Sequence, residues 1–345
     1  MQPDHGRGLH RSSPAGLMLA IDGASLEGGG QIIRTAVACA ALTGQSIVVD
    51  HIRARRSNPG LKNQHLAAIQ AVAATCEAEV QGAMMGSNQL IFRPGSPRRA
   101  EVTVDTGTAG AIPLIIQAWL PVAMLHGGSL TVTGGTEVRG APTIDYLEHL
   151  LLRVLRHHGA EVTLDIQQRG YFPAGGGTVK VTVAPSTLDP IRISESLRRS
   201  TGICSSAAGL PGHVVERQMS AAERAMRGIP DIEIPKRLKD LRTGGCPGSS
   251  CTVWAGTHGG SMLGRPGLPA EKIGAGAVAN LQEECAVGSD VDQYLADQLL
   301  VYLAVAGGQY TSSRFTLHAK TMLWLLNLFR YRIRYSGDTI TEFSA

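Results

Sequence analysis

The sequence predicts an α+β fold of three repeated β-α-β-α-β-β units, the third of them partial, with a smaller inserted α/β domain. Three observations predict it. One long segment recurs further along the chain, strand and helix patterns follow the same order in both copies, and a stretch rich in Gly, Ser, Thr and Arg interrupts them. With 345 residues, 43% of them hydrophobic and 17% charged, the chain can bury such a core.

The recurrence has a constant separation of 83 residues. Segments that begin at Asp22 and at Asp105 stay in register over about 60 positions, which indicates a duplicated structural unit. The same separation pairs Arg34 with Gln117, Gly44 with Gly127, Ser46 with Ser129, and Pro59 with Pro142.

Each copy has the same predicted elements. A short strand and a Gly-rich turn lead into a buried helix, and β-branched residues then predict a second strand. Apolar residues at helical spacing predict a second helix, and two strands close the unit, which gives two helices on a four-stranded sheet. The predicted first helices are 31–42 and 112–125, the strands after them 46–49 and 129–132, and the closing strands 79–80 with 90–92 and 161–164 with 178–183.

A partial third copy lies near the C-terminus. The pattern predicts an apolar helix over 294–306, a strand over 314–317 and a helix over 320–329. Almost no loop separates this strand from this helix, and His318 falls at their junction.

These patterns divide the chain into a large repeat domain and a small inserted one. The repeat domain is expected to comprise 17–185 and 273–345 and to carry catalysis, whereas 186–272 forms the inserted domain. Polar residues 1–16 are predicted to be a mobile extension. No apolar run reaches the roughly 18 residues that a membrane span needs, so a cytoplasmic location is expected.

The net charge argues against a protein that coats nucleic acid, and the cysteine spacing argues against a zinc centre. The net charge of +4 is compatible with an anionic partner but equally with an ordinary, mildly basic enzyme. The six cysteines lack the spacing of a zinc site, so reduced thiols are expected.

The turn before the first helix suits a phosphate group. Glycines 28–30 let a ligand approach the backbone closely, and the helix start offers unpaired N–H groups. Glu27 beside them suits a hard divalent cation that bridges phosphate oxygens. The alternative is a structural Gly-rich turn in which the helix dipole favours a carboxylate.

Basic residues gather near the same helix start and in the loop that follows. Guanidinium groups bind phosphate with two parallel hydrogen bonds, although a solvated basic loop has the same composition. A Walker A sequence does not occur, and the glycines at 274–276 are better explained as a helix start than as a dinucleotide fingerprint. The basic group comprises Arg34, Arg53, Arg55, Arg56, Lys62 and His65.

His318 is one of eleven histidines, and a histidine at a helix start is more often a surface residue than a nucleophile. The catalytic interpretation is chemically sound, because neutral imidazole attacks phosphorus and the phosphoramidate it forms stays reactive. A helix N-terminus favours the neutral imidazole and stabilises the anionic product.

In their order these segments closely resemble the RNA 3′-terminal phosphate cyclase family, from about residue 17 to 329. The resemblance rests on IDGASLEGGGQIIR, IRARRSNPGLKNQH, GTAGAIPLIIQAWLP, GYFPAGGG and VDQYLADQLL. It implies three repeated units like those of enolpyruvyl-transferring synthases, plus a small inserted domain. The fold alone does not license a function, whereas the motifs imply one.

The resemblance implies an ATP-dependent ligase that converts an RNA 3′-phosphate to a 2′,3′-cyclic phosphate. A histidine attacks the α-phosphorus of ATP with the help of a divalent cation, Mg²⁺ or Mn²⁺, and forms a covalent histidine–AMP. The AMP then moves to the RNA 3′-phosphate, and the neighbouring 2′-hydroxyl displaces it.

By position, the resemblance makes His318 the nucleophile and Glu27 the residue that contacts the metal. Family members usually carry Thr-Asn three and four positions after the nucleophile, whereas here Met322 follows Thr321, and the tail after 329 is atypical. The implied ATP-binding residues are Gln117, Tyr294, Leu295, Ala296, Asp297 and Gln298, and the implied RNA-end and phosphate-binding residues are Gln31, Arg34, Arg53, Arg55, Gln64 and His65.

Two alternatives remain open. A catalytically weak or silent relative that binds RNA in ribosome biogenesis shares the fold, although such relatives lose the nucleophilic histidine. An enzyme of the same class that acts on DNA or on 5′-phosphate ends shares the adenylation step.

Overall fold

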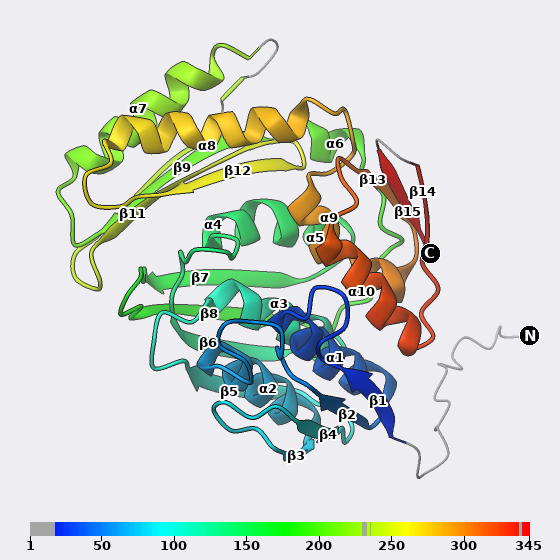
Figure 1. Cartoon of the computed structure of the whole chain (residues 1–345). Helices are drawn as coiled ribbons and strands as arrows, with labels where there is room; N and C mark the ends of the chain where they lie inside the picture. The colour runs from blue at the N-terminus through cyan, green and yellow to red at the C-terminus, as the bar shows by residue number, and fades with distance from the viewer. Residues whose placement is uncertain (1–17, 230–232, 235, 338–339) are drawn as a thin grey trace, which may run out of the picture.

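The computed structural model describes residues 18–345 except 230–232, 235, 338 and 339. The expected extension at 1–16 lies outside the described residues. The chain has a mixed α+β fold, and its described residues form four small sheets with helices between and beside them (Figure 1). No helix among the described residues is long and apolar enough to cross a membrane.

The first sheet is built from 19–93 and places two helices toward the centre of the molecule. Strand β1 pairs with β2 in parallel, and β4 pairs antiparallel with both β2 and β3, which gives the order β1-β2-β4-β3. The elements are β1 (Leu19–Asp22), α1 (Gly30–Thr43), β2 (Ile47–Asp50), α2 (Asn63–Cys76), β3 (Glu79–Gln81) and β4 (Leu90–Arg93).

The second sheet repeats this topology. Its strand order is β5-β6-β8-β7, with β5 and β6 parallel and the other pairs antiparallel. The second helix of this unit differs from the first unit, since it contains a π-helical stretch at Leu147–Leu152. The remaining elements are β5 (Ala100–Asp105), α3 (Ile112–Ala123), β6 (Gly128–Gly134), α4 (Ile144–Tyr146), α5 (Arg153–His157), β7 (Val162–Gln168) and β8 (Gly177–Val183).

The C-terminal sheet has the order β13-β15-β14. Ile191, far upstream in the sequence, forms a single parallel bridge with Gly308, which directly precedes β13. The elements are α9 (Gln293–Ala306), β13 (Gln309–Ser312), α10 (Leu317–Leu328), β14 (Arg334–Ser336) and β15 (Thr341–Ser344).

The predicted strand at 314–317 is wrong. The strand β13 ends at Ser312, and α10 begins at Leu317 because the hydroxyl of Thr316 accepts a hydrogen bond from the Ala319 backbone N–H at 2.8 Å. His318 therefore lies in the first turn of α10, after a short loop, and not at a direct strand-to-helix junction.

A fourth sheet lies between Ile191 and α9 in the sequence. Its order is β10-β9-β11-β12, and α7 and α8 pack on each other and on this sheet (Figure 1). The boundary expected at residue 272 falls inside α8. The elements are α6 (Glu195–Arg198), β9 (Thr201–Ala208), α7 (His213–Met226), β10 (Lys236–Arg242), β11 (Gly248–Ala255), β12 (His258–Leu263) and α8 (Ala270–Cys285).

A buried arginine joins the fourth sheet to the second. The side chain of Arg169 is 1% exposed and forms ion pairs of 2.6 Å with Glu137, 2.7 Å with Asp145 on α4 and 2.8 Å with Asp240 on β10. Because each charge in this group has a close partner, the network fixes how the two sheets meet.

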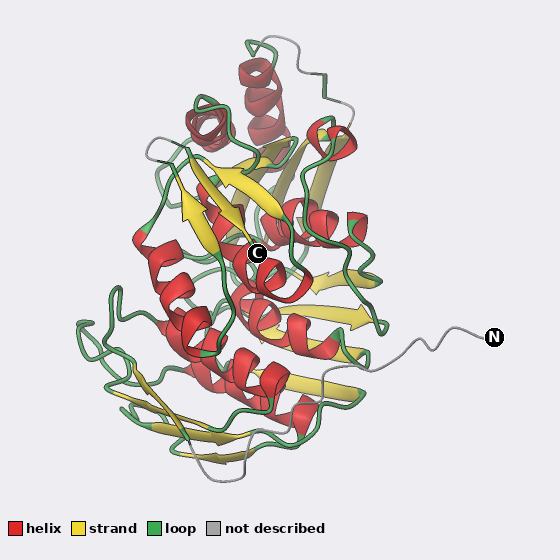
Figure 2. Cartoon of the chain, turned by 90° about the vertical axis from the view of Figure 1, so that its right-hand side faces the viewer, coloured by secondary structure: helices red, strands yellow, loops and turns green. Residues whose placement is uncertain are grey.

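Helices from the first, second and C-terminal sheets meet at the centre. Helices α1, α2 and α3 pack on one another, and α10 packs on both α1 and α9. Figure 2 shows these helices enclosed by the sheets. The N-terminal ends of α1 and α10 come together here, which positions the site.

Candidate active site

Glu27 and His318 form the centre of the site. Glu27 lies in the turn between β1 and α1, and its backbone N–H donates to Thr321 Oγ1 on α10 at 3.3 Å. Gln31 on α1 donates from Nε2 to the His318 carbonyl at 3.3 Å. These contacts hold the two elements together, and Nδ1 of His318 lies 3.0 Å from Oε2 of Glu27.

The carboxylate of Glu27 is ionised. The hydrogen bond with His318 and the ion pair with Arg56, whose Nη2 lies 2.7 Å from Oε1, lower the pKa of Glu27 to about 2. An ionised acceptor at Nδ1 keeps the proton of the neutral imidazole on that nitrogen, so Nε2 carries the free lone pair. The His318 side chain is 42% exposed, which leaves it open to a ligand.

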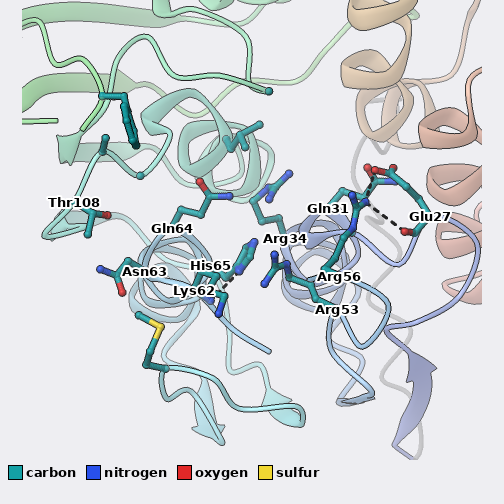
Figure 3. Close-up of a pocket in the computed structure, with 18 of the residues that line it drawn as sticks. Glu27, Gln31, Arg34, Arg53, Arg56, Lys62, Asn63, Gln64, His65 and Thr108 are labelled. Atoms are coloured by element: carbon teal, nitrogen blue, oxygen red, sulfur yellow. Dashed lines mark hydrogen bonds and ion pairs between the residues drawn. The ribbon is translucent and has the colours of Figure 1, made fainter. Parts of the chain in front are cut away.

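Glu27 and His318 both line a pocket of about 820 Å³ (Figure 3). Four of its lining residues carry positive charge, and Glu27 is the one acidic residue among those described that line it. The lining residues are Glu27, Gly29, Gly30, Gln31, Arg34, Arg53, Arg56, Lys62, Asn63, Gln64, His65, Met85, Thr108, Ala109, Gly110, Leu114, Gly140, Phe172, Pro173 and His318.

Arg34 is the most buried cation of the pocket. It is 9% exposed, and none of the ion pairs within 4 Å among the described residues involves it. Burial lowers the pKa of Arg34 to about 10, so the guanidinium stays charged at neutral pH. A buried charge without a close partner is costly, so this position favours an anionic ligand.

His65 is a neutral hydrogen-bond donor in the same pocket. Burial, with added repulsion from Arg34, Arg53 and Lys62, lowers the pKa of His65 to about 3. The Lys62 backbone N–H donates to His65 Nδ1 at 3.0 Å, so Nε2 carries the proton. That nitrogen lies so close to Gly30 that a Cβ there would be 2.1 Å from it. Glycine at the start of α1 therefore makes room for this donor.

A second cavity, of about 50 Å³, opens behind His318. It shares Gln31, Arg34 and His318 with the larger pocket and brings together three residues of the predicted ATP-binding set, Gln117, Asp297 and Gln298. Gln117 Nε2 donates to Gln298 Oε1 at 2.9 Å, and Met322 lines the same cavity.

Asp297 is held in this cavity as a protonated or easily protonated group. Burial raises the pKa of Asp297 to about 7, although the Thr316 hydroxyl lies 3.1 Å from both carboxylate oxygens. The same Thr316 hydroxyl caps α10, so the cavity and the His318 helix share one hydrogen-bonding group.

The structure brings most of the predicted site residues together. Gln31, Arg34, Arg53, Gln64 and His65 all line the larger pocket.

Four predicted site residues do not line either cavity. Arg55 is exposed, Tyr294 is 56% exposed, and the side chains of Leu295 and Ala296 are buried in the core. The sequence placed Arg56 in the basic group suited to phosphate but not among the residues implied to bind ATP or the RNA end, and it did not predict the contact with Glu27.

The donor set fits a cation only in part. No group of three or more His, Cys, Asp and Glu side chains suited to a metal occurs within the described ranges. Glu27 offers one carboxylate, which already pairs with Arg56, so a bound cation needs phosphate oxygens and water as its other ligands.

An ionised carboxylate that contacts a histidine beside a basic pocket is typical of an enzyme that acts on phosphate groups. The family model described as RNA 3′-terminal phosphate cyclase matches residues 25–333. The chain therefore belongs to the RNA 3′-terminal phosphate cyclase family and is an enzyme of that family.

Individual relatives are similar over nearly their whole length. A protein named RNA 3′-terminal phosphate cyclase from Archaeoglobus fulgidus is 42% identical over 333 residues, which cover 94% of this chain and 99% of the relative. One of the same name from Nitrosospira multiformis is 40% identical, with 90% of this chain and 91% of the relative covered. A third, from Thermococcus kodakarensis, is 40% identical, with coverages of 90% and 92%.

Proposed function

We propose that this enzyme uses ATP to convert an RNA 3′-terminal phosphate to a 2′,3′-cyclic phosphate through a covalent histidine–AMP. The observation that carries the proposal is the 3.0 Å contact between Glu27 and His318 at the place where the two cavities meet. A nucleophile there has the nucleotide on one side and the RNA end on the other.

The first step is attack by Nε2 of His318 on the α-phosphorus of ATP. A bond forms between nitrogen and phosphorus, the bond to the leaving oxygen breaks, and pyrophosphate departs. Glu27 holds the proton on Nδ1 and stabilises the positive charge that the imidazole gains. Arg34 lies beside both cavities and balances the charge of the phosphate oxygens.

The next two steps use the larger pocket. An oxygen of the RNA 3′-phosphate attacks the phosphorus of the histidine–AMP, and the imidazole leaves. The 2′-hydroxyl of the terminal ribose then attacks the 3′-phosphorus, loses its proton to solvent and releases AMP. The residues proposed to hold the RNA phosphates are Gln31, Arg34, Arg53, Gln64, His65 and Arg56, while Arg55 serves more distant backbone phosphates.

The nucleotide is proposed to occupy the region around the smaller cavity. A volume of about 50 Å³ is far below the roughly 300 Å³ of small ligand pockets. Binding therefore requires Gln117 and Gln298 to separate. Asp297 and the two glutamines then hydrogen-bond the nucleotide, Tyr294 offers a stacking face, and Leu295 and Ala296 contribute through the backbone of α9.

A divalent cation, Mg²⁺ or Mn²⁺, fits beside Glu27 when the phosphates of ATP supply most of its ligands. When bound there, such an ion would neutralise part of the phosphate charge. Arg56 must then give up part of its contact with Glu27.

We also propose that the first, second and C-terminal sheets are three copies of one unit, as in enolpyruvyl-transferring synthases. The shared strand orders and the bridge from Ile191 to Gly308 support this arrangement. The repeat domain would then comprise 17–185 and 273–345 with 186–272 inserted, although the packing of α8 on α7 moves the second boundary close to α9. A cytoplasmic location is part of the proposal.

Conversion of a 3′-phosphorylated RNA tests the function. The purified enzyme is incubated with ATP, Mg²⁺ and the RNA, and the product is examined for a terminus that resists phosphatase. His318→Ala should abolish the product, whereas His126→Ala, an exposed histidine outside both cavities, should leave it unchanged. A phosphatase-sensitive end after reaction with wild type would overturn the proposal and favour a silent RNA-binding relative.

A further inference from the structure

The larger pocket has two chemically different ends. Glu27, Arg34, Arg53 and Arg56 give one end its charge, and Figure 3 shows Thr108 and Asn63 on the side away from Glu27. The lining also includes four apolar side chains larger than alanine, which the reaction proposed above does not use. These are Met85, Leu114, Phe172 and Pro173.

Phe172 is the most exposed large apolar side chain of the pocket, with 75% of its surface exposed. It lies in a turn that the neighbouring residues hold firmly. Tyr171 is buried, and its carbonyl accepts a hydrogen bond of 2.7 Å from the Gly175 backbone N–H. Gly175 lies against Thr108, where a Cβ would be 2.7 Å from the carbonyl oxygen. The turn is therefore held against Thr108, on the side of the pocket away from Glu27, and its exposed Phe172 ring lines the pocket.

Met85 lines the pocket from a second turn. It is 55% exposed, and the two residues that follow it are hydrogen-bonded to the Leu61 backbone, with the Gly86 N–H donating at 2.9 Å and the Ser87 carbonyl accepting at 2.9 Å. Since Leu61 directly precedes Lys62 and Asn63, this turn is held beside the pocket residues on the side away from Glu27 (Figure 3). Two independently held turns thus expose apolar side chains to one pocket.

We propose that Phe172, together with Met85, is a stacking platform for one of the last two bases of the bound RNA. This inference rests on the proposed function. A nucleic-acid end needs cationic groups for its phosphates and a flat apolar surface for its bases, and the pocket offers both in one continuous lining. Stacking on a phenyl ring accepts any base, so the platform selects for a nucleotide and not for a sequence.

The test measures RNA binding apart from chemistry. The Kd of a short 3′-phosphorylated RNA is measured by fluorescence anisotropy without ATP. Phe172→Ala should raise the Kd roughly 5- to 100-fold, the range expected for loss of one stacked base, and Phe172→Tyr should bind nearly as wild type. Met85→Ala should weaken binding, whereas Met84→Ala, which is 68% exposed but outside the pocket, should not.

Abasic substrates locate the stacked base. If Phe172 stacks on one base, an RNA that lacks this base binds wild type and Phe172→Ala equally. Two abasic RNAs are used, one without the terminal base and one without the penultimate base. If Phe172→Ala raised the Kd by a similar factor for both of them and for the intact RNA, this would overturn the proposal. So would an unchanged Kd together with loss of self-association in sedimentation, which would assign the ring to a contact between copies.

The covalent step separates this inference from the proposed function. Phe172→Ala should form the covalent AMP from ATP at the wild-type rate, because no RNA takes part. If RNA binding by the wild-type enzyme depends on Phe172 but no covalent AMP forms, the proposed mechanism is contradicted while the stacking role of Phe172 is retained. A variant that loses adenylation and RNA binding equally would contradict the stacking role and assign the turn to support of the site.

Discussion

Oε2 of Glu27 lies 3.0 Å from Nδ1 of His318, although 291 residues separate the two in the sequence. The contact joins the first turn of the N-terminal unit to the first turn of α10. It fixes which nitrogen of the imidazole is free, and several consequences can be measured.

Replacing Glu27 by Gln should slow formation of the covalent AMP by about 100-fold or more, because an uncharged amide neither holds the proton on Nδ1 nor stabilises the imidazolium. The measurement is single-turnover labelling with α-labelled ATP. Asp22→Asn, which removes a carboxylate that pairs with exposed His51, is the matched control and should label normally. Equal rates for Glu27→Gln and wild type would refute the role of this carboxylate.

Two buried arginines should respond oppositely to replacement by Met. Arg34 has no ion pair within 4 Å among the described residues, so Arg34→Met should keep or raise the melting temperature while it weakens binding of 3′-phosphorylated RNA roughly tenfold or more. Arg169 has three carboxylate partners, so Arg169→Met should destabilise the fold by about 3–5 kcal/mol. Thermal unfolding and anisotropy measure both. Severe destabilisation by Arg34→Met would show that the protein itself satisfies this charge.

Asp297→Asn should stabilise the free enzyme at neutral pH. The pKa of Asp297 is raised to about 7 in the folded state, above its ordinary value of 3.8. Wild type therefore keeps the stability of the protonated form below pH 3.8 and loses it as the pH rises through 7, whereas the variant does not.

Melting temperatures of both proteins between pH 4 and pH 8 test this. The gain from Asp297→Asn should be small at pH 4 and largest at pH 8, with weaker ATP binding as the functional cost. A gain that does not change with pH would contradict the raised pKa.

Much of the fold could be predicted from the sequence because local signals agree with the packing. The helices at 31–42 and 112–125 match α1 and α3, since glycines mark their ends and their faces are apolar. The strand at 314–317 was predicted wrongly because Thr316, whose β-branched side chain also suits a strand, instead caps α10. Ile191 gave no signal at all, since its partner Gly308 lies beyond the inserted segment.

The sequence predicted which residues belong to the site, but it did not predict the contacts between them. Glu27 and His318 were both expected there through the resemblance, whereas the contact of Arg56 with Glu27 depends on how the loop at 51–58 turns. That loop places Arg55 in solvent and Arg56 against the carboxylate, and neighbouring arginines look alike in a sequence. Contacts between distant loops follow from tertiary structure, which no local pattern encodes.

The most direct test of the central claim is the site of covalent AMP. The enzyme is incubated with α-labelled ATP and Mg²⁺ without RNA, and labelled peptides are sequenced by mass spectrometry under mildly alkaline conditions that preserve a phosphoramidate. The proposed mechanism predicts acid-labile AMP on His318, absent from His318→Ala and present in His126→Ala. Label that survives in His318→Ala, or no label in wild type, would contradict it.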